Sequence, residues 1–308
     1  MSYPKKSYKY IFGPVSSRRF GSSLGIDLSP DKKCCNFDCL YCELAKAKVV
    51  NAIENPPLLS DIISELKLAL SEFKNIDVIT LTANGEPSLY PSLKELVSEV
   101  NCLKTTQKTL ILSNGTSVLD ADKFEAMLGL DIVKLSLDSA VQKTFRRIDR
   151  SLENIKIENL VEKMAEFRAK FRGLLVMEVL VVKGFNDTLE EFEALNLAFE
   201  IIKPDRIDIS SIDRPPAHEA SGIDDEILES LAKFITASPV VVARKKALNA
   251  KLEFSLDELR KLLKLRPQSK FDVEHNFAQS SKDALETLLQ NKEASRVNLA
   301  GVEFYKII

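Results

Sequence analysis

Six short runs rich in valine, isoleucine and leucine recur along the chain, and amphipathic stretches with a helical period separate them. Such nearly continuous apolar runs are typical of strands buried on both faces of a parallel sheet. Six units of strand followed by helix predict an α/β fold, either a complete or a partial barrel. The expected strands are GIDLSP (25–30), DVITLTA (77–83), TLILSN (109–114), DIVKLSL (131–137), LLVMEVLVV (174–182) and RIDISSI (206–212); the clearest helices are 59–73, 92–100, 159–171 and 189–202.

Four of the five cysteines lie in one short stretch, CCNFDCLYC (34–42), directly after the first expected strand. The amino-terminal sequence is basic and lacks the apolar core of an export signal, and no apolar run is long enough to cross a bilayer. We therefore expect a cytoplasmic protein with no membrane partner, in which thiols stay reduced. Clustered cysteines in that environment are more often metal ligands or redox groups than disulfides.

Cys35, Cys39 and Cys42 have the spacing C-x3-C-x2-C, so three thiolates on one loop can converge on a small object. A structural zinc site needs four protein ligands. The remaining cysteines and histidines lack the spacing of a zinc finger: Cys34, which adjoins Cys35 and is expected to point away, Cys102, His218 and His275. An iron–sulfur cluster bound by three cysteines would leave one iron open to a small molecule. Zinc and buried core cysteines remain alternatives.

This spacing, and the loop's place after the first strand, resemble the radical S-adenosylmethionine (radical SAM) superfamily. The resemblance implies a partial (βα)6 TIM-like barrel in which Cys35, Cys39 and Cys42 bind a [4Fe-4S] cluster. It implies that the amino and carboxylate groups of S-adenosylmethionine bind the open iron. One electron, from a low-potential donor such as flavodoxin or ferredoxin, then cleaves this cofactor to methionine and a 5'-deoxyadenosyl radical. Tyr41, before the last cysteine, would lie near the adenine.

Polar residues follow the next three strands at their carboxyl ends, where α/β barrels gather their chemistry. ANGEP (83–87) places Gly85, Glu86 and Pro87 after the second strand. Glycine lets a backbone approach a ligand, and a carboxylate can accept from an ammonium group. By resemblance this element meets the amino group of the cofactor, although a plain strand-to-helix turn is the alternative. The next two strands end in side chains suited to a ribose, to a carboxylate or to helix capping: Ser113, Asn114, Ser136 and Asp138.

Glu178 and Arg214 are the candidate catalytic residues. Glu178 lies inside the fifth apolar run, where a carboxylate is costly unless it is partnered, so it faces either the barrel mouth or Lys183. Arg214 follows the sixth run in DRPP and would meet an anionic substrate, the cofactor carboxylate or an ordinary ion-pair partner. Arg18 and Arg19, in a turn-rich basic segment ahead of the barrel, are further candidates for the substrate side.

The tail changes character after residue 239, so we expect two domains: a barrel with its basic N-terminal segment over 1–239 and a small domain over 240–308. The small domain is predicted to be winged-helix-like, with helices at 255–267, 271–277 and 280–292 and a hairpin at 297–308 around an Ala-Gly turn. Such modules often bind nucleic acid, and Lys282 and Lys292 belong to the third helix. A lid or a protein contact is equally compatible with this pattern.

The net charge of -2 conceals a segregation. Residues 1–33 carry seven Lys or Arg against two Asp or Glu, and residues 240–308 carry thirteen against nine. Two basic ends around an acidic middle could hold a polyanion, although solvated helix faces give the same composition.

The basic segment FGPVSSRRFGSSLGIDLSP (12–30), the cysteine loop and DRPP (213–216) occur in this order. With the spacing of the other elements, they resemble a radical SAM subgroup related to tRNA wyosine-synthesising enzymes, over roughly residues 10–218. No cysteine precedes Cys34, so the second cluster of those enzymes, and their reaction, are not expected here.

The favoured hypothesis is a radical SAM enzyme that modifies a tRNA nucleotide. One alternative is a radical SAM enzyme that acts on a protein site or a small metabolite. Another is a zinc- or cluster-bearing nucleic-acid regulator without catalysis. ANGEP and the polar strand ends disfavour the regulator, because a regulator needs no cofactor pocket.

Overall fold

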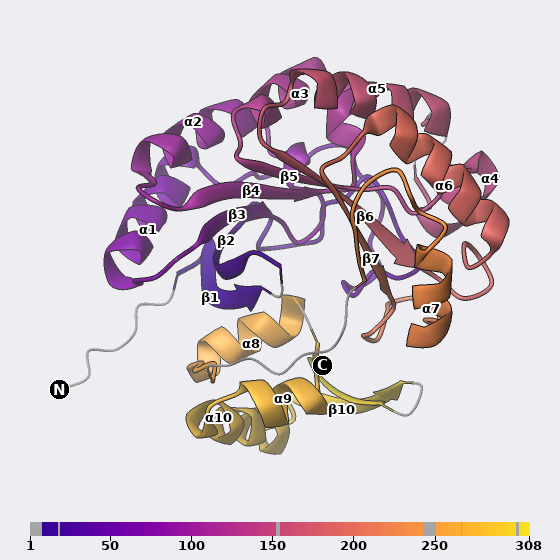
Figure 1. Ribbon diagram of the computed structural model, residues 1–308. Coiled ribbons are helices and arrows are strands. Elements are labelled where there is room, and N and C mark those ends of the chain that lie inside the picture. Colours follow the sequence, from indigo (N-terminus) through magenta and orange to yellow (C-terminus); the bar gives the residue numbers. More distant parts are fainter. Residues whose placement is uncertain (1–7, 18, 152–154, 243–250, 266, 300–301) are drawn as a thin grey trace.

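The main body of the molecule is one curved sheet of eight strands, hydrogen-bonded in chain order from β1 to β8 (Figure 1). β1 and β2 form an antiparallel hairpin, and every later pair of neighbours is parallel. The computed structural model describes residues 8–17, 19–151, 155–242, 251–265, 267–299 and 302–308. The strands of this sheet are β1 (Ile11–Ser17), β2 (Gly21–Asp27), β3 (Val78–Thr82), β4 (Lys108–Ser113), β5 (Ile132–Ser136), β6 (Leu174–Val181), β7 (Arg206–Ser211) and β8 (Val240–Val242).

Helices α1 to α6 cover the outer, convex side of the sheet (Figure 1). Each forms because its apolar residues recur at helical spacing; α2, for example, buries Leu93, Leu96, Val97 and Val100 against its neighbours. The helices of the main body are α1 (Leu59–Glu72), α2 (Leu93–Leu103), α3 (Ala121–Leu128), α4 (Gln142–Ile148), α5 (Ile157–Lys170), α6 (Leu189–Ile202) and α7 (Asp225–Ala232), with 3-10 turns η1 (Pro87–Leu89) and η2 (Thr116–Leu119).

The six expected strands correspond to β2 to β7, although β2 begins four residues before and ends three residues before the expected strand 25–30; the four clearest expected helices are α1, α2, α5 and α6. The α/β class is confirmed, and the mostly parallel sheet fits a partial barrel. Two strands were not expected: β1, in the segment predicted to be rich in turns, and β8 at the far edge. β8 extends the sheet just past residue 239, the predicted domain boundary, which stays a prediction.

Alternate residues of the parallel strands face opposite sides of the sheet. The outward-facing residues join the helices in one apolar core, with members such as Ile79, Leu81, Ile111, Val133 and Leu135. The inward-facing residues line a cavity, and several of them are polar or charged: Thr80, Thr82, Lys134, Glu178 and Ser210. The runs that look apolar in the sequence therefore carry the polar groups of the barrel interior.

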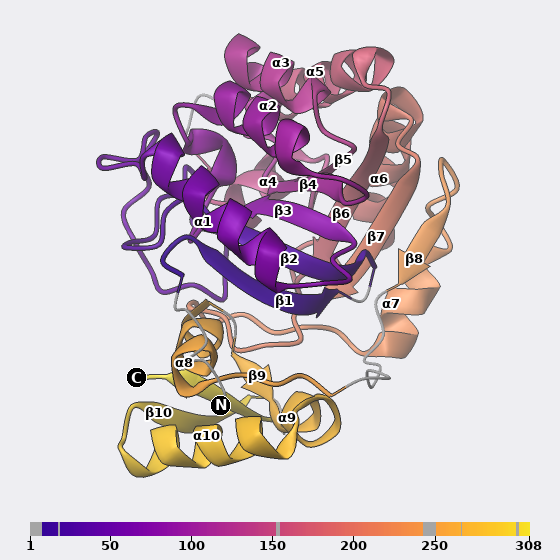
Figure 2. The same cartoon turned by 90° about the vertical axis from the view of Figure 1, so that its left-hand side faces the viewer.

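The C-terminal part of the chain has an apolar core of its own, which includes Leu259, Phe277 and Leu288. It lies beneath the β1–β2 hairpin (Figure 2). The three predicted helices and the predicted hairpin are present, and a short strand, β9, pairs with the hairpin; the Ala-Gly turn at 300–301 lies outside the described residues. These elements are α8 (Leu256–Leu265), β9 (Gln268–Ser269), α9 (Lys270–Asn276), α10 (Gln279–Gln290), β10 (Ala294–Leu299) and β11 (Val302–Ile307). A bilayer-spanning helix, which would need greater length and a more apolar sequence, does not occur in the described part of the chain.

Candidate active site

The cysteine-bearing loop leaves the carboxyl end of β2 and is held against the carboxyl end of β3. The Cys34 amide donates to the Asn84 carbonyl (2.9 Å), and the Glu86 amide donates to the Cys34 carbonyl (2.8 Å). Gly85 lies between these two contacts with a φ of +135°, and a Cβ built on it would lie 1.9 Å from the Cys34 carbonyl oxygen. Only glycine permits so close an approach of two backbones, so the position of the loop depends on Gly85.

Three cysteines of this loop line one cavity of about 180 Å³: Cys35, Cys39 and Cys42. Cys34 is 1% exposed and belongs to the apolar core, as expected for a residue that points away. Cys102 is exposed on α2. The structure therefore brings together the three cysteines that the spacing singled out and separates the other two from them.

The three thiols fit a cluster better than a single metal ion. Among the described residues, no three Cys, His, Asp or Glu side chains converge closely enough to hold one ion. Burial raises the pKa of the Cys35 thiol to about 12 and the pKa of the Cys39 thiol well above its usual value. Metal ligation requires thiolates, so these sites need a strongly positive group to hold them deprotonated. A [4Fe-4S] cluster would provide that charge, and the three cysteines would hold it at different irons, so their sulfurs need not meet at one point.

A group of polar side chains around Asp38 borders the cysteine loop. His218 Nε2 lies 3.0 Å, and Arg150 Nη1 lies 3.4 Å, from the Asp38 carboxylate. Lys33 Nζ lies 3.2 Å from Cys42 Sγ. His218, which the sequence left as a possible metal ligand, is thus engaged with Asp38.

Glu86 lines the cysteine cavity and is 2% exposed. One of its carboxylate oxygens accepts from the Ser88 amide (3.0 Å), and the other accepts from the Asn114 amide (2.7 Å). Burial raises the pKa of this carboxyl, against the opposing effect of these hydrogen bonds. ANGEP was interpreted either as a cofactor-binding element or as a plain strand-to-helix turn, and its geometry fits both. Glu86 caps the short helix η1, whose first residue is Pro87, and Glu86 also borders the cavity.

The polar residues at the ends of β4 and β5 reach the same cavity, which Ser113, Asn114 and Ser136 line together with Gly85. Asn114 Nδ2 donates to Asn36 Oδ1 (2.7 Å) and lies 4.0 Å from Cys35 Sγ. Asn114 therefore ties the end of β4 to the cysteine loop. Ser113 Oγ accepts from the Gly115 amide (3.2 Å), which is a local turn contact of the kind that the sequence left open.

A second cavity of about 1410 Å³ occupies the barrel interior and extends to the C-terminal part of the chain. Its wall includes inner-face residues of the sheet and, from the C-terminal part, residues such as Phe254, Lys261 and Leu262. Five residues line both this interior cavity and the cysteine cavity: Cys42, Leu44, Leu112, Lys134 and Glu178. The two cavities therefore share a wall.

Tyr41 lines the interior cavity, and its hydroxyl donates to the Asp138 carboxylate (2.5 Å). Asp138 also accepts a hydrogen bond from the Leu180 amide (2.7 Å). Among the described residues, Asp138 does not line either cavity. Burial raises the pKa of the Asp138 carboxyl to about 6 and the pKa of the Tyr41 hydroxyl well above its usual value. Asp138 thus lies behind Tyr41, although the sequence suggested that both reach the cofactor.

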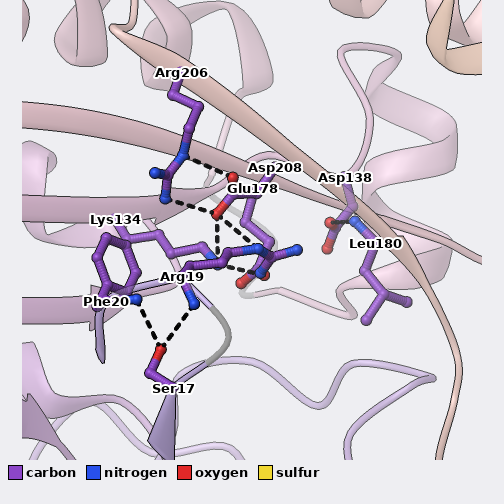
Figure 3. Close-up of polar contacts among 9 residues, drawn as sticks. All are labelled: Ser17, Arg19, Phe20, Lys134, Asp138, Glu178, Leu180, Arg206 and Asp208. Carbon is purple, nitrogen blue, oxygen red and sulfur yellow. Dashed lines mark hydrogen bonds and ion pairs between the residues drawn. The ribbon is translucent and has the colours of Figure 1, made fainter. Parts of the chain in front are cut away.

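Glu178 belongs to a network of five charged side chains on the inner face of the barrel (Figure 3). Its Oε1 lies 2.5 Å from Lys134 Nζ and 3.1 Å from Arg19 Nη1. Asp208 Oδ2 lies 3.2 Å from Arg19 Nε and 3.3 Å from Lys134 Nζ, while Asp208 Oδ1 lies 2.9 Å from Arg206 Nε. Burial alone would raise the pKa of Glu178, but Lys134 and Arg19 lower it below its usual value, so this carboxylate is charged.

The structure decides between the alternatives that the sequence left open for Glu178 and Arg214. The alternatives for Glu178 were the barrel mouth and Lys183. Glu178 lines both cavities and pairs with Arg19 and Lys134, so the pairing with the exposed Lys183 is wrong. Arg214 lines the interior cavity and lies 3.5 Å from Glu43 and 3.8 Å from Asp272, so it forms the ion pairs that were one of its alternatives. Arg18 lies outside the described residues.

Comparison with known proteins agrees with this geometry. The sequence model of the Radical SAM superfamily matches residues 32–196, just over half of the chain. The chain belongs to the radical SAM superfamily. A UPF0026 protein of Helicobacter pylori is 37% identical over 304 residues, which cover 98% of each chain. A GTP 3',8-cyclase of Peptoclostridium acidaminophilum is 26% identical over 208 residues, which cover 67% of this chain and 59% of that protein.

A solved structure shares the fold. The crystal structure of a radical SAM methyltransferase from Sphaerobacter thermophilus superposes with a TM-score of 0.57 at 11% sequence identity, covering 72% of this chain and 66% of that chain. Radical SAM proteins bind a [4Fe-4S] cluster and S-adenosylmethionine, and they need a reductant. The chain is accordingly an iron–sulfur enzyme of this superfamily.

Three residues of the interior network of this radical SAM barrel were missed in the sequence: Lys134, Arg206 and Asp208. Lys134 and Asp208 are charges inside apolar runs, the same signal that singled out Glu178, and Arg206 begins the run that contains Asp208. The strand register pairs Glu178 with Asp208 and with Ser136, two residues after Lys134. Charges inside apolar runs of three adjacent strands, no more than two residues out of register, are expected to pair with one another, because an unpaired buried charge is costly.

The Gly85→Ala substitution should lower the free energy of unfolding of the apoprotein by roughly 2–4 kcal/mol, from backbone strain plus overlap with Cys34. Urea denaturation measures this loss. Gly184→Ala is the matched control, because Gly184 also has positive φ (+75°) but no atom lies within 4 Å of its Cβ position. That variant should lose only about 1–2 kcal/mol of strain. Equal losses in the two variants would show that the Cys34–Gly85 approach is not as close as described.

Proposed function

We propose that Cys35, Cys39 and Cys42 bind the cluster of this radical SAM enzyme, and that its substrate lies in the interior cavity. The observation that carries the proposal is the shared wall: the cavity with the three thiols and the interior cavity are separated by only a few common residues. When bound, the cluster and S-adenosylmethionine supply the reductive cleavage that yields a 5'-deoxyadenosyl radical. The regulator hypothesis is set aside, because the chain belongs to a superfamily of enzymes.

The residues around the cysteine cavity would hold S-adenosylmethionine. Each Glu86 oxygen accepts one amide, and the hydroxyls of Ser88 and Ser113 also hydrogen-bond to this carboxylate, so the cofactor ammonium group would share or replace one of these hydroxyl contacts. Gly85 has no side chain, so its backbone would be accessible to the cofactor, and Pro87 would fix the turn that directs Glu86 toward the cavity. The side chains of Ser113, Asn114 and Ser136 offer hydrogen bonds to a ribose or a carboxylate.

Tyr41 would present its ring to the adenine, held in place by Asp138. The hydroxyl of Tyr41 is engaged with the buried Asp138 carboxylate, so the ring cannot turn freely. We therefore assign Asp138 a positioning role behind Tyr41. A ring fixed in this way reduces the conformational entropy lost when a ligand stacks on it.

Glu178 and Arg214 would act on the substrate side of the cavity. The charge of Glu178 is stabilised by Lys134 and Arg19, which makes it a poor general base at neutral pH and a better hydrogen-bond acceptor. Arg214 joins the loop after β7 to α9 through Asp272, so it would help to fix the C-terminal part as a wall of the cavity. A wall of this kind excludes water from a reactive centre.

The electron donor would dock on a basic surface beside the cysteine loop. The Leu40 amide donates to the Ile148 carbonyl at the end of α4, so α4 and the loop are neighbours. Residues 142–150 expose Lys143, Arg146, Arg147 and Arg150, whereas Asp149 is buried. An acidic low-potential protein such as flavodoxin or ferredoxin would find complementary charge there.

A tRNA nucleotide is the substrate that the sequence favoured, and the observation that supports it is cavity size. About 1410 Å³ exceeds the roughly 300–1,000 Å³ of sites for drug-sized ligands, and enzymes that act on a base commonly extrude it into a pocket. The order of helix, strand, two helices and hairpin supports a winged-helix-like C-terminal module. Its helix α10, however, has one lysine and two carboxylates, Lys282, Asp283 and Glu286, and α8 lines the cavity. This favours the lid alternative for the module.

Replacing any one of Cys35, Cys39 and Cys42 by alanine should abolish the cluster, because a missing thiolate leaves an iron without its protein ligand. Iron and sulfide analysis after anaerobic reconstitution should give about four of each per wild-type chain and a small fraction of that per variant. Cys34→Ala and Cys102→Ala are the controls and should retain the cluster. A colourless wild-type protein that holds stoichiometric zinc would reject the cluster assignment.

The Glu86→Gln substitution should weaken S-adenosylmethionine binding by roughly 1.5–3 kcal/mol, because an amide cannot pair with an ammonium group as a carboxylate does. Equilibrium binding to the cluster-loaded protein measures this change. Glu191→Gln is the matched control, since Glu191 is also a buried carboxyl, bonded to Ser139 and Thr144. Unchanged affinity in Glu86→Gln would remove Glu86 from the cofactor site.

If tRNA is the partner, its binding to the full-length protein should fall by about a factor of 10³ or more between 50 and 200 mM salt, as condensed counterions are released. An anisotropy titration at the two salt concentrations checks this. Comparing bulk tRNA nucleosides from a deletion strain and its parent provides the chemical readout. Weak, salt-insensitive binding with identical nucleosides would leave a protein site or a small metabolite as the substrate.

A further inference from the structure

The charged network inside the barrel holds more positive than negative groups. Arg19, Lys134 and Arg206 face the two carboxylates, Glu178 and Asp208, and all five are linked by contacts of 3.3 Å or less. The guanidinium group of Arg206 also lies over the Phe20 ring, with its Cζ 5.1 Å from the ring centre. One positive charge is therefore uncompensated within this network, and because Lys134 and Asp208 are almost fully buried, an unpaired charge beside them is costly.

Arg19 also has an unused donor. Its Nη1 contacts Glu178 and its Nε contacts Asp208, but its Nη2 is shielded from solvent and has no hydrogen-bond partner within the described part of the chain. Buried charged donors are normally satisfied, so an unused one marks a network that another acceptor would complete. Arg19, Lys134 and Glu178 line the interior cavity, so a ligand there can reach the network.

Another part of the interior-cavity wall is mainly acidic. It carries five carboxylates and one lysine: Asp224, Asp225 and Glu226 at the start of α7, and Asp257, Glu258 and Lys261 on α8. A polyanion entering past these carboxylates would be repelled. A molecule with a single anionic group, neutral or cationic elsewhere, suits both the network and the acidic part of the wall.

We infer that the interior network binds a single oxyanion, a carboxylate or a phosphate, carried by the substrate. Arg19 supplies the recognising guanidinium, and Lys134 supplies the second cation. Glu178 and Asp208 hold these two cations in place and limit the net charge, so that the site prefers one anionic group. The inference rests on the proposed function only in placing the substrate in the interior cavity.

Calorimetric titration of the cluster-loaded protein with inorganic phosphate, and separately with acetate, tests this site. Sodium chloride keeps the ionic strength constant, and each titration is repeated with S-adenosylmethionine present. We expect saturable binding of at least one anion, and the better-bound anion identifies the group as a phosphate or a carboxylate. Arg19→Gln should weaken binding about tenfold or more, the usual effect of losing a charged hydrogen bond.

Three further variants test the direction and the specificity of the effect. Glu178→Gln should tighten anion binding, because it removes a carboxylate that competes for Arg19 and Lys134. Arg296→Gln should leave binding unchanged, since Arg296 forms a comparable pair with Glu286 on the surface (3.3 Å). Arg19→Lys, which keeps the charge but loses the guanidinium donors, should bind with intermediate affinity and replaces Arg19→Gln if that variant does not fold.

Three results would overturn the inference: no binding of either anion, equal affinities in wild type and the Arg19 variants, or loss of binding when S-adenosylmethionine is present. The last would assign the anion site to the cofactor carboxylate. Substrate-free cleavage of S-adenosylmethionine by the reduced protein is measured separately. Its failure would count against the proposed function, whereas failure of anion binding alone would leave that function standing.

Discussion

The close approach of two backbones, at Cys34 and Gly85, is the contact on which the site depends. Two hydrogen bonds clamp the cysteine loop to the end of β3, and the missing side chain of Gly85 makes room for them. Cys34 is thereby turned into the apolar core, which directs its neighbour Cys35 toward the cavity. The same turn places Glu86 beside the thiols, so one steric condition positions both the cysteines and the carboxylate.

The second constraint is the pleat of the parallel sheet. Because successive side chains alternate between faces, β5, β6 and β7 can bury apolar residues under the helices and still present Lys134, Glu178 and Asp208 inside the barrel. Charges in such a place are stable only when they are paired. The helices supply the burial that holds these strands in register, and the register brings the charges together.

The sequence predicted the elements whose signals are local. The runs that became β2 to β7 and the periodic stretches that became α1, α2, α5 and α6 depend on neighbouring residues alone. The C-x3-C-x2-C spacing likewise identified the three thiols that share a cavity. β8 has only three residues, and β1 contains Gly13 and Pro14, so neither carries a strong strand pattern.

What could not be predicted depends on contacts between distant residues. Arg19 reaches Glu178 across 159 positions of the chain, and nothing near Arg19 in the sequence indicates this. Asp138 was expected at the cofactor because it ends a strand, yet its side chain turns behind Tyr41. The direction of a single side chain at a strand end depends on packing against other loops, which local sequence does not specify.

The cavities change the functional interpretation of the C-terminal part of the chain. As a sequence, its helices and basic residues suggested a surface for nucleic acid. In the structure, Phe254, Lys261 and Leu262 form part of the cavity wall, and Arg214 contacts Asp272 across the junction. A barrel with six strand-and-helix units leaves its interior open at one side, and a radical intermediate requires protection from water. The helix α8 and the β1–β2 hairpin both line that interior, which is the basis for proposing that the C-terminal part encloses it.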